Sequence, residues 1–156
     1  MAFQARGAES QQGAGPRTAI DVVSEIYDTH SERDTPRFED LLADDVVWHT
    51  SESHPLRGEG PWVGADAVVR QVVDPLNHDW DGYITRVDEL IDAGDRVVSV
   101  GRYRGPYKPT GRHLDAEVCT IFTVSEGRIV TFQQFTDTAQ FRWAMGVDSP
   151  DPTWGA

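Results

Sequence analysis

The sequence has little basic charge and a single cysteine. Its 156 residues hold 14 Lys and Arg against 26 Asp and Glu, which gives a net charge of −12. A chain this acidic, without a basic cluster, repels phosphate backbones and anionic lipid surfaces, so nucleic acids and membranes are excluded as partners. One cysteine, Cys119, excludes an intramolecular disulfide framework. It lies among strand-forming residues, and we expect a buried structural thiol there.

Long apolar runs and cofactor motifs are missing as well. No run approaches the roughly 20 apolar residues of a transmembrane helix. The N-terminus lacks the apolar core of a secretory signal, so a cytoplasmic location is the simplest expectation. There is no Gly-rich phosphate loop, Walker pattern or nucleophile elbow, and we expect no cofactor. We also expect no metal, although a site built from His49, Glu52 and His54 is the one alternative.

What remains is the pattern of one domain. Residues 1–17 are rich in Gly, Ala, Gln and Ser without hydrophobic periodicity, and we predict a disordered leader there. The domain spans residues 18–146, and residues 147–156 form a C-terminal tail. Apolar residues at three- and four-residue steps predict a first helix over residues 20–30.

Capping and turn residues divide the next part of the chain. Thr35 followed by Pro36 is typical of a helix start, with Thr35 as the N-cap. We expect this second helix to end at Asp44-Asp45. A strand, a loop rich in Pro and Gly, and a third helix follow, at residues 46–50, 51–63 and 68–76.

The second half is rich in strand-forming residues. Four strands are predicted, at about residues 80–91, 96–104, 112–124 and 128–136. A final helix runs from its N-cap, Asp137, to Met145. Helices followed by consecutive strands indicate an α+β class. We expect a cone-shaped fold in which three N-terminal helices pack on a curved antiparallel β-sheet and enclose an apolar pocket.

Four stretches follow one another in a familiar order, at residues 25–48, 58–68, 92–98 and 110–138. They resemble the SnoaL-like and ketosteroid isomerase-like proteins of the nuclear transport factor 2-like superfamily. The resemblance covers residues 18–145 and implies the same cone fold. It does not fix the function, because this superfamily contains cyclases, isomerases, hydrolases and a transport factor on one frame.

The acid–base residues of these relatives map only in part. The resemblance to ketosteroid isomerases places their tyrosine on Tyr27, their base on Thr50 and their protonated acid on Thr120. It places the His and Asp of SnoaL-type cyclases on Thr120 and Gln134. The Asp-Arg-Asp triad of related epoxide hydrolases finds no matching carboxylate. A threonine cannot abstract a carbon-bound proton near neutral pH, so the steroid isomerase reaction is not supported.

Strand alternation predicts which side chains line the pocket, because residues two apart share a face. Tyr27, Tyr103 and Gln134 are predicted catalytic groups, joined by His49 near the mouth as an acid or base. The predicted ligand-binding residues are Trp48, Thr50, Val118, Thr120, Phe122 and Phe132. For each there is a simpler structural alternative: the aromatic residues could fill the core, and Gln134 could be a satisfied buried amide. His54 is the other imidazole near the predicted mouth and a further candidate acid or base, but both histidines are most simply exposed.

These residues suit a small, flat, hydrophobic and oxygenated ligand. We predict a cyclase, isomerase or hydratase type of enzyme acting on a polyketide-like or other secondary metabolite, without a cofactor. The alternatives are a non-catalytic binding or stress-associated protein and a protein-interaction module. Arg102, Arg104 and Glu117 are predicted on the outer sheet face together with apolar residues, and we expect a homodimer through that face.

Overall fold

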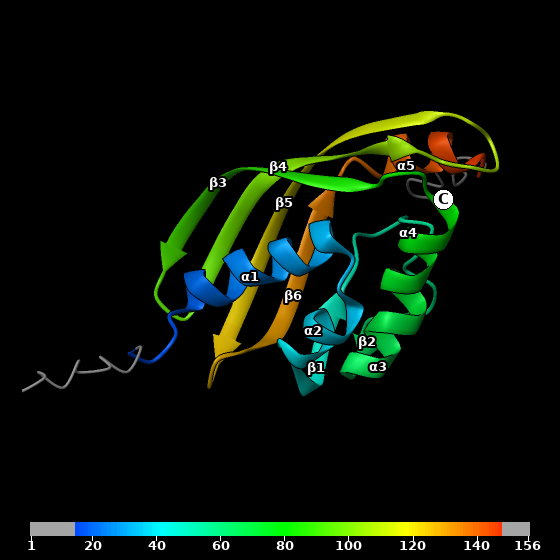
Figure 1. Ribbon diagram of the computed structural model, residues 1–156. Helices are drawn as coiled ribbons and strands as arrows, with labels where there is room; N and C mark the ends of the chain where they lie inside the picture. The colour runs from blue at the N-terminus through cyan, green and yellow to red at the C-terminus, as the bar shows by residue number, and fades with distance from the viewer. Residues whose placement is uncertain (1–14, 148–156) are drawn as a thin grey trace, which may run out of the picture.

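The computed structural model describes residues 15–147, in which helices pack on one face of a curved sheet (Figure 1). Most of the predicted leader and all but the first residue of the predicted tail lie outside the described residues. Among the described helices, none is long and apolar enough to cross a membrane.

Helix α1 (Ala19–Glu32) matches the predicted first helix and lies across the sheet (Figure 1). Thr18 caps it, because its side chain accepts a hydrogen bond from the backbone N–H of Asp21 while the Asp21 carboxylate accepts from the N–H of Thr18. Val22 and Ile26, one turn apart, are buried against the sheet. The amphipathic pattern therefore fixes which face of α1 points inward.

Helix α2 (Thr35–Asp40) is shorter than predicted. Its N-cap is Asp34, whose carboxylate accepts from the N–H of Arg37 at 3.2 Å, so the assignment of Thr35 as the cap was wrong by one residue. The helix ends before Asp44-Asp45, because strand β1 (Leu42–His49) already begins at Leu42 and pairs with strand β6.

The predicted third helix consists of three parts. After the short strand β2 (Trp62–Val63), α3 (Ala65–Val68) leads into a wide π-helical turn, η1 (Val69–Val73), and then into α4 (Asp74–Asp79). Pro75 has no N–H to donate to the preceding turn, which is consistent with this change of hydrogen-bond pattern. The helical segment continues to Asp79, three residues beyond the predicted end at Leu76.

Six strands form one sheet in the order β2-β1-β6-β5-β4-β3. The four long ones are β3 (Ile84–Ala93), β4 (Arg96–Pro106), β5 (His113–Ser125) and β6 (Arg128–Thr136). They form consecutive antiparallel pairs, as predicted, whereas β1 runs parallel to β6. The sheet is therefore mixed, since no hairpin joins β1 to β6 and dictates an antiparallel direction.

Two clusters of buried side chains fill the space between helices and sheet. One gathers residues of α1, β1 and η1 around Trp48 and Phe132. The other joins Trp80, Tyr83 and Tyr103 to Phe141 of the last helix, α5 (Thr138–Met145). Asp137 caps α5 by accepting from the N–H of Gln140 at 3.3 Å, as expected for an N-cap.

Candidate functional site

A central cavity of about 70 Å³ lies where these two clusters meet. Its walls are mainly apolar and aromatic, and include Ile26, Phe38, Trp48, Leu76, Phe122 and Phe132. Trp48 stacks on Phe132 with ring centroids 3.5 Å apart and an interplanar angle of 6°. Phe122 meets Phe132 edge to face at 5.4 Å. The result is a flat aromatic wall on the sheet side of the cavity.

One rung of the sheet supplies polar groups beside this wall. Ser99, Thr120 and Gln134 are register partners on β4, β5 and β6, and all three are buried. The Tyr27 hydroxyl of α1 donates to Ser99 Oγ at 2.9 Å. The Gln134 side-chain N–H donates to the Tyr103 hydroxyl at 2.9 Å. Strand parity had placed these side chains on the same face, and the hydrogen bonds show that they meet.

Burial controls the ionisation of these tyrosines. Desolvation raises the pKa of Tyr103 to about 12, although its hydrogen bonds with Gln134 and Thr120 oppose the rise. Desolvation likewise raises the pKa of Tyr27 and of Tyr83 above the ordinary value of 10.0. All three phenols are neutral near pH 7 and can act as hydrogen-bond donors or acceptors.

Gln134 is also held from its other end. The backbone N–H of Ser51 donates to Gln134 Oε1 at 3.2 Å, and the Ser51 hydroxyl donates to the Gln134 carbonyl at 2.9 Å. Both amide ends are thus engaged, which orients the side chain toward Tyr103. The loop after β1 is tied to β6 through these bonds, so Thr50 and Gln134 are fixed together in the cavity wall.

Two histidines line the cavity: His54, which the sequence placed near the predicted mouth, and His30, which it did not assign to the site. His54 was expected at the surface, but it is 6% exposed, so that expectation was wrong. His30, at the last turn of α1, places its Nε2 atom in a buried position without a hydrogen-bond partner among the described residues. Burial lowers the pKa of each imidazole from 6.5 to about 4. Both are therefore neutral near pH 7.

A further polar atom in the wall has no partner. Thr50 is 5% exposed, and its Oγ1 makes no hydrogen bond within residues 15–147. Native proteins rarely leave such atoms unsatisfied, because burying a hydroxyl without a partner costs about 1–3 kcal/mol. Thr50 Oγ1 and His30 Nε2 are thus two unpaired polar atoms on residues that line the same cavity, available to a ligand.

Three predicted site residues do not line the cavity. His49 lies in a separate polar groove with Glu52, Arg57 and Gln133, because it pairs with Gln133 on the outward-facing register of the sheet. Val118 packs in the cluster around Tyr103 and Phe141. Thr120 is 1% exposed and lies behind the tyrosines, whose hydroxyl groups it meets.

The remaining predicted residues do line the cavity: Tyr27, Trp48, Thr50, Tyr103, Phe122, Phe132 and Gln134. No Asp or Glu joins them in the described lining. Within residues 15–147, no three His, Cys, Asp or Glu side chains are grouped as a metal ion would require. The polar groups of the cavity are therefore phenols, hydroxyls, one amide and two neutral imidazoles, all of which can form hydrogen bonds.

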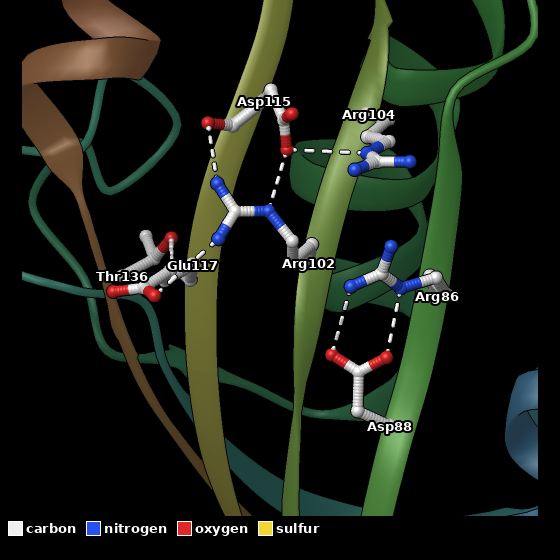
Figure 2. Close-up of polar contacts among 7 residues, drawn as sticks. All are labelled: Arg86, Asp88, Arg102, Arg104, Asp115, Glu117 and Thr136. Atoms are coloured by element: carbon white, nitrogen blue, oxygen red, sulfur yellow. Dashed lines mark hydrogen bonds and ion pairs between the residues drawn. The ribbon is translucent and has the colours of Figure 1, made fainter.

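The outer face of the sheet carries an ion network across β3, β4 and β5 (Figure 2). Arg102 Nε lies 2.6 Å from Asp115 Oδ1, and Arg104 Nε lies 3.2 Å from the same oxygen. Arg102 also reaches Glu117 at 3.4 Å, and Arg86 pairs with Asp88 at 2.8 Å. The arginine hydrogen bonds lower the pKa of Asp115 below its ordinary value. The predicted outward positions of Arg102, Arg104 and Glu117 are confirmed.

This architecture is the cone fold in which helices and a curved sheet enclose a central cavity. Residues 23–132 match the SnoaL-like domain family. The chain belongs to that family. A solved NTF2-like protein from Burkholderia thailandensis is 36% identical, with a TM-score of 0.77, covering 83% of this chain and 98% of that one.

Two other solved structures share the fold at lower identity. TerC, co-crystallized with polyporic acid, is 20% identical with a TM-score of 0.71, covering 82% of this chain and 98% of that one. A protein thought to be a polyketide cyclase, from Pseudomonas putida, is 19% identical with a TM-score of 0.66, covering 85% of this chain and 99% of that one. A comparison with curated proteins gave no match.

Proposed function

We propose that the protein is a cofactor-independent enzyme of the cyclase, isomerase or hydratase type, acting on a small, flat, oxygenated molecule. The observation that carries this proposal is the composition of the central cavity. An aromatic wall lies beside Tyr103 and Gln134, which are hydrogen-bonded at 2.9 Å, and beside the unpaired atoms Thr50 Oγ1 and His30 Nε2. Such a site orients a planar ligand and hydrogen-bonds its oxygen atoms.

Catalysis in this site rests on fixed hydrogen-bond donors. Reactions of this class develop negative charge on an oxygen, as an enolate or an alkoxide. Donors that are already oriented in a water-poor cavity stabilise that charge without reorganising. Gln134 is oriented by Ser51, and Tyr103 by Gln134, so both are held before a ligand arrives. The neutral imidazole of His30, whose Nε2 has no hydrogen-bond partner among the described residues, supplies a group that can accept a proton.

The cavity volume sets the size of the ligand. At about 70 Å³ it is well below the 300–1,000 Å³ of pockets for drug-sized ligands. We infer that the ligand, or the part of it that enters, is one ring or a fused pair, and that its entry requires lining side chains such as Leu56 and Leu76 to move. A solved structure that shares the fold was co-crystallized with a small molecule, polyporic acid, which supports a small-molecule ligand here.

Hydrogen exchange at carbon tests this proposal without knowledge of the natural substrate. The protein is incubated with 2-indanone in D₂O, and loss of the α-hydrogen signals is followed by proton NMR. We expect exchange faster than in buffer, and slower in Gln134→Leu than in the wild-type protein. The matched control is His78→Gln, whose side chain is 88% exposed, and it should exchange as the wild-type protein does.

A second candidate is a non-catalytic binding protein. One observation favours it: the described lining of the cavity contains no carboxylate, the usual base of such reactions. In that case 2-indanone would bind, as saturation-transfer NMR would show, but its α-hydrogens would exchange no faster than in buffer.

We also propose that a second copy of the chain covers the outer sheet face. Val100 and Phe135 are 37% and 54% exposed there, next to the ion network of Arg102. Acidic and basic side chains on one face can pair with those of an identical copy about a twofold axis.

Light scattering at micromolar concentration should give a dimer. Phe135→Lys should shift it toward monomer, whereas Trp143→Lys, on α5, should not. A monomeric wild-type protein would contradict the proposal.

A further inference from the structure

His54 is oriented through one of its two ring nitrogens. Its Nδ1 accepts a hydrogen bond from the backbone N–H of Leu56 at 3.0 Å. The ring packs on Phe141 with centroids 4.2 Å apart, and the residue is 6% exposed. Nδ1 needs a lone pair to accept this bond, so the proton of the neutral ring is on Nε2. Backbone and packing together select one tautomer and one ring orientation.

The Nε2–H group is the remaining donor of the ring. His54 lines the central cavity, and the side-chain hydrogen bond that its ring forms within residues 15–147 is the one at Nδ1. Two arginines lie close to this residue: the backbone N–H of Arg57 donates to the His54 carbonyl at 3.0 Å, and Arg142 donates to the carbonyl of the adjacent Ser53 at 3.4 Å. The other titratable residues lining the cavity are Tyr27, His30, Tyr83 and Tyr103. Burial lowers the pKa of His54 to about 4, so the ring stays neutral near pH 7.

We propose that His54 is a neutral hydrogen-bond donor that binds a carbonyl or phenolic oxygen of the ligand through Nε2–H, and that it is not the base of the reaction. The inference rests on the proposed function, because it names the ligand atom that the same cavity holds. It narrows the substrate class to small carbonyl compounds or phenols whose oxygen gains negative charge during the reaction.

The hydrogen bond from Leu56 decides between donor and base. To act as a base, His54 would have to use the Nδ1 lone pair and lose that bond, or first change tautomer. As a donor, His54 keeps the hydrogen bond from Leu56 and offers its Nε2–H group to a ligand oxygen. A neutral imidazole also leaves its proton on nitrogen when an oxyanion forms opposite it, and so stabilises charge without transferring a proton.

The first experiment measures the tautomer in the wild-type protein. Long-range ¹H–¹⁵N correlation spectra of histidine-labelled protein distinguish protonated from bare ring nitrogens, and His54→Gln assigns the signals by their loss. We expect His54 to be neutral and protonated at Nε2 near neutral pH. A ring protonated at Nδ1, or at both nitrogens, would overturn the proposal.

The second experiment measures binding of 4-fluorophenol by ¹⁹F NMR titration. His54→Phe keeps the ring volume but removes the N–H, and should weaken binding about tenfold, as the loss of one buried hydrogen bond does. His54→Gln restores a donor near the Nε2 position and should recover most of the affinity. His78→Phe, the same change at an exposed position, should leave binding unchanged.

The outcomes separate this inference from the proposed function. If Tyr103→Phe weakens binding and His54→Phe does not, the role of His54 is wrong and the proposed function stands. If the wild-type protein does not bind 4-fluorophenol, both are wrong. If His54→Phe does not fold, the tautomer in the wild-type protein and the affinity of His54→Gln decide.

Discussion

The hydrogen bond between Tyr103 and Gln134 joins two strands inside the cavity at 2.9 Å. Tyr103→Phe removes the acceptor and leaves the Gln134 N–H without a partner, in a residue that is 7% exposed. We expect the fold to persist, with a loss of about 1–2 kcal/mol in the free energy of unfolding. Gln134→Leu should cost more, because it also removes the acceptor of the Ser51 N–H. Urea denaturation measures the free energy of unfolding of both variants. Equal losses in the two would argue against the shared hydrogen-bond network.

Trp48 is 6% exposed. Its ring stacks on Phe132 and also lies close to Phe38, with ring centroids 6.1 Å apart, so it is well packed. Trp48→Ala should therefore lower the free energy of unfolding by about 3–5 kcal/mol. Trp143 is 53% exposed, and Trp143→Ala is the matched control, expected within about 0.5 kcal/mol of the wild-type protein. A loss in Trp48→Ala as small as in the control would mean that the ring faces open space.

Strand parity was sufficient to predict that Trp48, Tyr103 and Gln134 share a cavity, since a period of two fixes which side chains face inward. It could not show that His54 is buried in the cavity wall. That residue lies in a loop, where no period links sequence to direction, and its burial depends on Phe141, far away in the sequence. His30 does follow the helical pattern of α1, so its inward position could be predicted. No motif, however, marked it as functional.

At the scale of elements, β3 and β4 approach each other closely at Gly101. A Cβ there would collide with the backbone oxygen of Arg86, beside a bulge between Val87 and Glu89. Gly101→Ala should displace β3 and cost about 1–3 kcal/mol or more. Val100→Ala, a residue away on the outer face, should cost less than about 1 kcal/mol. Thermal unfolding measures the stability of both variants. A Gly101→Ala variant as stable as the wild-type protein would contradict the close approach of β3 and β4.

The sequence indicated most elements, and its errors have local causes. The end of α2 was placed too late, because Leu41 and Leu42 continue a helical pattern although β1 already begins at Leu42. The parallel pairing of β1 with β6 could not be predicted from turns, since a long stretch of chain separates the two strands. The hairpins after Gly94 and Gly127 were predictable because their turns are short and local.

At the scale of the molecule, the buried histidines make stability depend on pH. The pKa of His30 and of His54 is about 4 in the folded state and near 6.5 when exposed. The unfolded chain therefore binds more protons between these values, and stability falls as pH is lowered from about 6.5 toward 4. Each histidine contributes about 3 kcal/mol over that window.

Urea titrations across this window should show His54→Gln losing less stability than the wild-type protein. Equal losses would contradict the burial of His54.

The central claim is that the cavity binds an oxygenated ring through its hydrogen-bonding groups as well as its aromatic wall. The most direct test compares 4-fluorophenol with fluorobenzene, which differ by one hydroxyl group, in ¹⁹F NMR titrations of the wild-type protein. The polar atoms around Tyr103, Gln134 and Thr50 predict that 4-fluorophenol binds about tenfold more tightly. Equal affinity for the two probes, or binding of neither, would contradict this account.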